Sequence, residues 1–292
     1  MVLQIIVNGL TMGCVYALIA LGYSMVYGCL KFINFAHGDV FMWGACFGLI
    51  FARMGGIPFP LALILTMVCT GLLGVILEFL AYRRLRNVPR VVVTASALGA
   101  SIVLSNLALV LVGAETYSVP PFFETQYFNI GDLVVNSLQL ILLGCSIVLM
   151  LFLNWFINKS KWGKAIRATS ENMSVASLMG INTNKIISVT FFIGSAFAGA
   201  AGLLIGIYYD AVYSTMGYMA GMKAFTAAVL GGIGSIPGAM IGSLILGLVE
   251  SFGTTYISSS MGPAISFAIL IIVLLVKPTG LIGTGDTHSN RV

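Results

Sequence analysis

Charged residues are scarce in this 292-residue sequence, in which Asp, Glu, Lys and Arg together make up only 8%. A soluble domain carries roughly 25% charged residues, so the composition excludes an ordinary soluble protein. Hydrophobic residues make up 59% and form long runs between short polar stretches, a pattern typical of polytopic α-helical membrane proteins. A β-barrel would show short segments of strict alternation instead. We therefore predict an all-α, polytopic integral membrane protein.

Histidine and cysteine are also few. There are two His and five Cys, and no two Cys have the CxxC spacing. The cysteines lie mostly in apolar runs, which favours buried small side chains over a disulfide framework. His37 and Asp39 lack companions for a metal site, since the other histidine, His288, is far along the chain and helical positions i and i+2 face different ways. We expect no metal and no other cofactor. An intramembrane enzyme would need a nucleophile–base pair or a metal cluster, and the sequence offers neither.

Glycine, by contrast, is abundant, with 34 residues, several at GxxxG spacing such as Gly9/Gly13 and Gly44/Gly48. Small residues let helices approach closely in lipid. We interpret these pairs as general helix-packing positions and infer no dimer face from them. No internal repeat is evident, although a transporter-type inverted repeat is compatible with the sequence.

Nine apolar segments divide the chain, and most have the roughly 20 residues that a span needs. Segment 219–233 is short and ends in a glycine-rich stretch, so it is either a span or a re-entrant half-helix. We expect eight or nine transmembrane or re-entrant helices within a single transmembrane domain, residues 1–292. With no Lys or Arg among the first thirty residues, we expect no cleavable signal peptide. The predicted segments are 4–28, 33–53, 59–82, 91–112, 135–157, 186–208, 219–233, 236–257 and 262–277.

Basic residues set the orientation. Eight of the fourteen Lys and Arg fall within residues 83–90 and 159–167, which the positive-inside rule places in the cytoplasm. Segment 113–134 has acidic residues and no Lys or Arg, so we predict that it is periplasmic. The N-terminus is then outside and residues 278–292 form a cytoplasmic tail. Arg53 is placed on the outer side and is the one exception to the positive-inside rule.

The predicted cytoplasmic segment 158–185 mixes apolar and charged residues too closely for a flexible tether. We predict one helix over Lys164–Ser170 and a second that Asn172 or Ser174 caps and that ends at Gly180. Two short amphipathic helices on the inner face can dock into a groove of a partner or lie on lipid headgroups. The residues alone leave both options open.

Polar groups inside the apolar segments are candidates for function, because charge is costly in the membrane. Glu250 is predicted to line the pathway or to lock helices together. A proton relay through His37 and Asp39 would need a partner across the bundle, and no Lys or Arg within the membrane is obvious. Glu78 is predicted to pair with Arg83 or to snorkel to the interface. We therefore expect no dedicated charged pocket for substrate.

The stretch INFAHGD, which holds His37 and Asp39, is predicted to be a capped, hydrogen-bonded helix start near the inner interface that packs against a neighbour. Asn8 and Asn106 either cross-link helices by hydrogen bonds or line a cavity. The candidates for translocation or helix locking are Asn8, His37, Asp39, Asn106 and Glu250.

Long motifs also carry a family resemblance. They include GKAIRATSENMSVASLMGIN, FFIGSAFAGAAGLLIG, KAFTAAVLGGIGSIPGAMIGSLILGLVES, KPTGLIG and KFINFAHGDV, and the likeness extends over nearly the whole chain. The sequence resembles the permeases of bacterial branched-chain amino acid ABC importers, and most of all their H-type subunit. The resemblance implies a type II-like importer permease in the bacterial inner membrane.

The resemblance also implies partners. These are a second permease subunit of the M type in a heterodimer, two cytoplasmic ATPases, and a periplasmic protein that delivers leucine, isoleucine or valine. Residues 164–181 would be the element that couples to the ATPases, with Lys164, Arg167, Ala168, Glu171, Asn172, Ala176 and Gly180 as its candidate residues. The sequence has no GxxxxGK[ST] motif, so we expect a transport subunit that is not itself an enzyme and has no nucleic-acid partner.

Two other transport functions remain open. Permeases for urea and short-chain amides resemble this family, and sequence alone separates them poorly. A stand-alone secondary transporter driven by an ion gradient would need buried ion ligands on a broken helix, for which 231–234 is the only hint.

Overall fold

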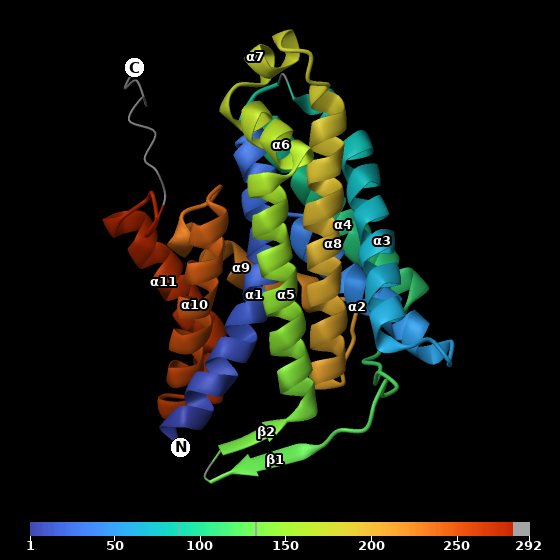
Figure 1. Ribbon diagram of the computed structural model, residues 1–292, viewed down its shortest axis with the longest axis vertical. Coiled ribbons are helices and arrows are strands. Elements are labelled where there is room, and N and C mark those ends of the chain that lie inside the picture. Colours follow the sequence, from blue (N-terminus) through green and yellow to red (C-terminus); the bar gives the residue numbers. More distant parts are fainter. Residues whose placement is uncertain (87, 132, 283–292) are drawn as a thin grey trace.

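The computed structural model describes residues 1–86, 88–131 and 133–282, so the predicted tail 278–292 lies mostly outside the described residues. Long helices run side by side between two ends of the molecule (Figure 1). We call the end with residues 83–86 and 158–185 the basic end. The opposite end, which carries the N-terminus and a small β-hairpin, is the hairpin end (Figure 1).

The helices follow the apolar segments of the sequence closely. Those of the first half are α1 (Val2–Leu30), α2 (His37–Arg53), α3 (Phe59–Leu77) with a π-helical turn η1 (Glu78–Tyr82) and a 3-10 turn η2 (Arg83–Leu85), α4 (Arg90–Leu111) and α5 (Ser137–Lys159). Those of the second half are α6 (Lys161–Glu171), α7 (Met173–Leu178), α8 (Thr183–Tyr209), α9 (Met216–Gly231), α10 (Ile236–Tyr256), a 3-10 turn η3 (Ser259–Met261) and α11 (Gly262–Val276).

Seven helical segments in the described part of the chain are long and apolar enough to cross a membrane. They include α1, α3 with its extension, α4, α5, α8, α10 and α11 with η3, while α2 and α9 have only 17 and 16 residues. The predicted polytopic, helical membrane fold is confirmed. The sequence did not predict the hairpin of β1 (Tyr127–Ile130) and β2 (Leu133–Asn136), which pair antiparallel with Tyr127 opposite Asn136.

Helices α2 and α9 begin inside the bundle. His37, the first residue of α2, lies against Gly22, which is eight residues, or about 12 Å, before the end of α1. Gly38 of α2 faces Gly217 and Gly221 of α9, so the first turns of the two helices meet there. The prediction that 33–53 forms a full span is therefore wrong, because the chain turns back before α2 starts. For 219–233 the re-entrant alternative describes the start of α9 better.

Helices α1–α2–α3 and α8–α9–α10 form two repeats of opposite direction. Lys31 and Asp210 cap α1 and α8 with left-handed backbone, at φ 54° and 50°, and the next helix starts six residues later in both cases. Gln139 contacts Asn8 near the start of α1 and Tyr208 near the end of α8, which shows that α1 and α8 are antiparallel. Helix α1 packs mainly on α10, as α8 does on α3. The structure thus contains the inverted repeat that the sequence left open.

Glycines let these helices cross at backbone contact. A Cβ atom on Gly9 or Gly13 of α1 would lie only 2.9 Å from a Cα atom of α10. Gly44 of α2 lies against the backbone of Gly199 in α8. Two of the GxxxG pairs therefore pack helices of the same chain, as their small size favours in lipid.

Candidate functional site

A cavity of about 710 Å³ lies between α1, α8, α9 and α10. It extends from Asn8 and Tyr209, near the hairpin end, to Met216 in the first turn of α9. This volume is within the range of roughly 300–1,000 Å³ that is usual for small-molecule sites. The cavity therefore reaches from one end of the bundle to the level where α2 and α9 meet.

An ion pair between Lys223 of α9 and Glu250 of α10 borders this cavity. The two side chains are only 16% and 13% exposed. Tyr16 of α1 donates a hydrogen bond to Glu250 at 3.0 Å and accepts one from Lys223 at 3.4 Å. The ammonium and the carboxylate are thus held beside one hydroxyl group at the wall of the cavity.

Lys223 is the functional candidate that sequence reasoning missed, and the expectation that the apolar segments hold no obvious Lys or Arg is wrong. The sequence did contain evidence for this pair. Lys223 is the single charged residue of the apolar segment 219–233, and Glu250 is the single charged residue of segment 236–257. Two isolated opposite charges on consecutive helices favour a pair, because each alone is costly in the membrane. Glu250 itself lies where the sequence placed it, at a cavity.

Asn8 and Asn106 differ in their surroundings, and the predictions for them have different outcomes. Asn8 lines the cavity and also accepts hydrogen bonds from Gln4 at 3.2 Å and from Gln139 of α5 at 3.0 Å, so it does both things that were predicted for it. Asn106 is exposed on α4 and donates to the carbonyl of Ile102 in its own helix at 2.7 Å. Among the described residues it neither cross-links helices nor lines the cavity of about 710 Å³, and both predictions for it are wrong.

The helix start at His37 is closely packed, and Asn34 just before it accepts a hydrogen bond from Tyr82 of η1 at 2.6 Å. His37 is 1% exposed and its ring lies 4.7 Å from that of Tyr23, between centroids. Among the described residues, none forms a hydrogen bond with either of its ring nitrogens, and Ala36 provides no side-chain cap. The predicted packing, the place of Asp39 in the first turn and the hydrogen bonding of this stretch to a neighbour are confirmed, but the predicted side-chain cap is wrong. The turn-back of residues 31–36 places His37 deep beside Gly22, away from the end of α1.

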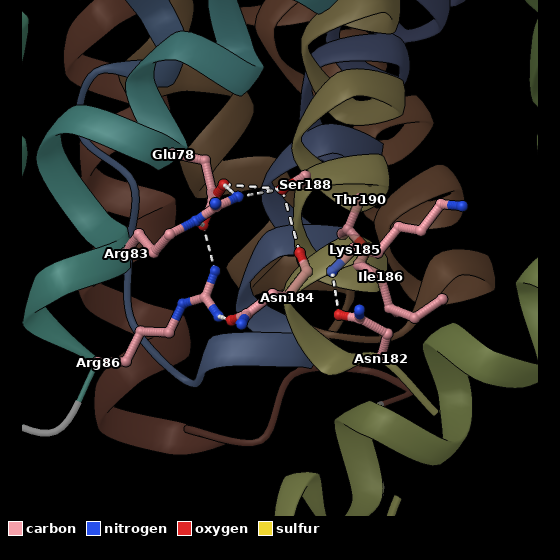
Figure 2. Close-up of polar contacts among 9 residues, drawn as sticks. All are labelled: Glu78, Arg83, Arg86, Asn182, Asn184, Lys185, Ile186, Ser188 and Thr190. Carbon is pink, nitrogen blue, oxygen red and sulfur yellow. Dashed lines mark hydrogen bonds and ion pairs between the residues drawn. The ribbon is translucent and has the colours of Figure 1, made fainter. Parts of the chain in front are cut away.

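Glu78 forms a second charged cluster, at the basic end (Figure 2). The carboxylate has no exposed surface, and it pairs with Arg83 at 2.8 Å and with Arg86. Ser188 in the first turns of α8 donates to it at 2.8 Å, and Arg86 reaches Asn184 of the same helix at 2.5 Å. The predicted Glu78–Arg83 pair is confirmed. The cluster joins the end of α3 to the start of α8.

The segment 158–185 folds into α6 and α7, which protrude at the basic end (Figure 1). Asn172 caps α7 by accepting from the Val175 amide at 3.0 Å, and Gly180 has a φ of +83°, as the predicted cap and C-terminal glycine require. Helix α6 buries Gly163, Ile166 and Thr169 on one face. The two predicted helices are confirmed, the first being longer than expected at both ends.

The candidate coupling residues are not equally available to a partner. Ala176 is 3% exposed and packs inward, so it contributes to the fold of the segment and not to its surface. Arg167 donates to the carbonyl of Ile157 at 2.9 Å, and so ties α6 to the end of α5. Lys164, Ala168, Glu171, Asn172 and Gly180 are exposed.

The sequence missed the apolar tip of this segment. Leu178 and Met179 are 86% and 78% exposed. They end α7, and Gly180 follows them directly.

Comparison with known proteins identifies relatives along almost all of the chain. A family model described as "branched-chain amino acid transport system / permease component" matches residues 5–274. The high-affinity branched-chain amino acid transport system permease protein LivH of Escherichia coli K12 is 44% identical, over 98% of this chain and 97% of that protein. LivH of Salmonella typhimurium is also 44% identical, and BraD of Pseudomonas aeruginosa is 40% identical, each over 98% of this chain and 97% of the relative.

Proposed function

Because this chain belongs to the branched-chain amino acid transport permease family, we propose that it carries leucine, isoleucine or valine across the bacterial inner membrane. It is a multi-pass membrane protein and the permease subunit of an ABC importer. ATPase and binding-protein components therefore work with it. The observation that carries the proposal is the cavity of about 710 Å³ at the hairpin end, opposite the protruding α6–α7 pair.

The cavity suits the periplasmic side of such an importer. The hairpin end carries the acidic stretch 113–134, and the basic end carries both clusters of Lys and Arg. With the basic end in the cytoplasm, the cavity faces a binding protein that delivers the solute. This conformation is the outward-facing state of an alternating-access cycle.

The inner side is closed in this state by the Glu78 cluster. It fixes the end of α3 to the first turns of α8, and α8 follows directly on α7. Movement of the α6–α7 pair by the ATPases would pull on the start of α8 and so act on this cluster. ATP binding would thereby favour one of two arrangements of the same helices.

Residues 164–181 are the proposed coupling element. The exposed Leu178 and Met179 would enter an apolar cleft of an ATPase, with Lys164, Ala168, Glu171 and Asn172 around it. Arg167 would keep α6 rigid on α5, so that force on the tip moves the bundle. We propose that the second permease subunit is a different, M-type chain, since the likeness of this chain is to H-type subunits. ATP hydrolysis would occur entirely on the ATPases.

Reconstitution tests the proposed substrate. The complete complex in proteoliposomes should take up labelled leucine only when both ATP and the loaded binding protein are present. Labelled urea should not enter. Uptake of urea without leucine, or leucine uptake driven by an ion gradient after the ATPases are removed, would overturn the proposal.

Substitution of the apolar tip tests the coupling. The double variant Leu178→Asp, Met179→Asp should lose ATP-driven uptake and retention of the ATPases on an affinity-tagged permease, because aspartate does not enter an apolar cleft. Ser177→Asp is the matched control, since it adds charge to an exposed position of α7 and leaves the tip intact. Unchanged assembly and uptake in the double variant would rule out this docking role.

A further inference from the structure

The Lys223–Glu250 pair stands apart from the other ion pairs in residues 1–86, 88–131 and 133–282, because those involve Glu78 and do not line the cavity of about 710 Å³. Lys223 and Glu250 are on different helices, and both side chains reach the cavity surface. Tyr16 bonds to both of them and holds the two charges beside one hydroxyl. A molecule that enters the cavity therefore meets a positive and a negative group side by side.

The wall near this pair is apolar. It includes Met12, Val15 and Ile19 of α1, and Met216 and Ala220 on the first turns of α9. These side chains offer an aliphatic ligand dispersion contacts and removal from water. The cavity thus places an apolar surface next to a pair of opposite charges.

We propose that Lys223 and Glu250 are the binding site for the main-chain ammonium and carboxylate of the transported amino acid. Glu250 takes the ammonium, Lys223 takes the carboxylate, and the branched side chain lies on the wall formed by α1 and α9. Tyr16 stays hydrogen-bonded to Glu250. This assignment rests on the proposed function, since it presupposes that an amino acid enters the cavity.

Charge balance favours such an exchange. Without solute, Lys223 and Glu250 pair with each other, so neither charge is left without an opposite charge beside it. A zwitterion is neutral overall and supplies one new partner for each of them. The site is therefore charge-balanced both empty and occupied.

The internal pair also explains how a permease can recognise a solute without holding it. The solute binds only by replacing the attraction between Lys223 and Glu250. The two residues pair again when it leaves, which weakens its binding and speeds its release. Urea has no charge with which to replace either partner. The pair accordingly fits an amino acid better than it fits a neutral amide.

The alternative role is a lock that only joins α9 to α10. Both roles require the pair for normal transport, but they differ when the charges are reversed. A lock keeps working when the two residues are exchanged, because the attraction is unchanged. A binding site does not, since the carboxylate and ammonium of the solute would then have to turn around while the branched side chain kept its place on the apolar wall.

The experiment uses the complete transporter in proteoliposomes with its binding protein. Lys223→Met and Glu250→Gln should each lower ATP-driven leucine uptake by about tenfold or more, the expected effect of losing a charge-assisted hydrogen bond. Lys223→Arg and Glu250→Asp should stay within about threefold of the native rate, since they preserve both charges. The exchanged variant Lys223→Glu, Glu250→Lys should assemble and unfold like the native protein and still transport at least about tenfold more slowly.

A second readout locates the solute directly. A diazirine analogue of leucine, delivered by the binding protein and irradiated, should label peptides that contain Met12 to Ile19 or Met216 to Ala220. This labelling should disappear in Lys223→Met and Glu250→Gln, but not in the control Asn106→Leu, whose side chain lies on the exposed face of α4.

Recovery of leucine uptake in the exchanged variant would overturn the assignment and leave a lock. Labelling that persists in Lys223→Met and Glu250→Gln would overturn it as well. The proposed function fails separately, through the absence of leucine uptake by the native complex. Its failure is therefore distinguishable from failure of the binding site.

Discussion

Glu78 and Glu250 are acidic residues in the later part of the third helical segment of each inverted repeat: Glu78 lies in η1 directly after α3, and Glu250 lies in α10. Glu78 is completely buried at the basic end, between two arginines and Ser188 of α8. Glu250 is at the hairpin end, pairs with one lysine, and borders a cavity. The repeat α1–α2–α3 is thus closed around the carboxylate of Glu78, whereas the repeat α8–α9–α10 has a cavity beside the carboxylate of Glu250.

The difference shows how a nearly symmetric bundle becomes directional. Arg83 and Arg86 belong to the same segment as Glu78, so this cluster is local and needs only the start of α8 to complete it. The Glu250 cluster is assembled from α1, α9 and α10, and a solute can reach it. We infer that Glu78 holds the inner side shut, whereas Glu250 is available for transport.

The largest expected difference is in stability. Glu78→Ala should lower the free energy of unfolding by about 3–5 kcal/mol, because it leaves two arginines without their carboxylate. Glu250→Ala should cost clearly less, since water in the cavity can solvate Lys223. Thermal unfolding of the two purified variants in the same detergent measures this. Equal losses would contradict the contrast between a closed and an open cluster.

The helix crossings that precede the two carboxylates should be equally sensitive. Gly74 of α3 lies against Ser195 and the Phe191 carbonyl of α8, and Gly247 of α10 lies against the backbone of α1. Gly74→Val and Gly247→Val should each cost about 1–3 kcal/mol through overpacking. Gly144→Val is the control, because a Cβ there meets nothing within 4 Å. Unfolding temperatures that match the control would mean that these crossings are loose.

A loss of comparable size is expected for one of two hydroxyl groups, one in each cluster. Ser188→Ala removes a hydrogen bond to a buried carboxylate and should cost about 1.5–3 kcal/mol. Tyr16→Phe removes the corresponding bond to Glu250, but water in the cavity can replace it, so the stability loss should be smaller. The two variants are compared by unfolding in detergent. A greater loss in Tyr16→Phe would reverse the assignment of the closed side.

The smallest effect is expected outside both clusters. Asn106→Leu should change stability by no more than about 0.5 kcal/mol, because this side chain bonds only to its own helix. Leucine uptake by the complete transporter should also be unchanged. A large loss of assembly would show instead that the exposed face of α4 contacts the second permease subunit.

The sequence predicts the helices well, because hydropathy and capping act locally. The segments ended within a few residues of the observed helices, and Asn172 and Gly180 marked α7 correctly. Hydropathy and capping did not predict how far inside the bundle α2 and α9 begin. That depth depends on how residues 31–36 and 210–215 turn back, which is set by contacts such as Gly38 with Gly217 across the bundle.

The candidate site was found in part. An isolated carboxylate in an apolar run identified Glu250, but its partner Lys223 was hidden in a short segment of uncertain class. The inverted repeat escaped notice because the equivalent positions share geometry and not residue type: Lys31 and Asp210 carry opposite charges, yet both are left-handed caps. Exposure also could not be read from sequence, as Ala176 and Asn106 show.

Access from the two sides of the membrane tests the central claim most directly. One variant keeps Cys29, which is 5% exposed between α1 and α8 near the basic end, and replaces the other four cysteines by alanine. A second replaces all five and adds Thr254→Cys at the cavity. Both are treated with a membrane-impermeant maleimide, applied from either side, with and without ATP and loaded binding protein.

Without nucleotide, the Thr254→Cys thiol should react only from the periplasmic side and Cys29 should not react from the cytoplasmic side. During ATP-driven transport, reaction at the cavity should fall and reaction of Cys29 should rise. If the Thr254→Cys thiol reacts only from the cytoplasm, or if neither rate responds to ATP, then the account of one repeat closed and the other open to the outside is wrong.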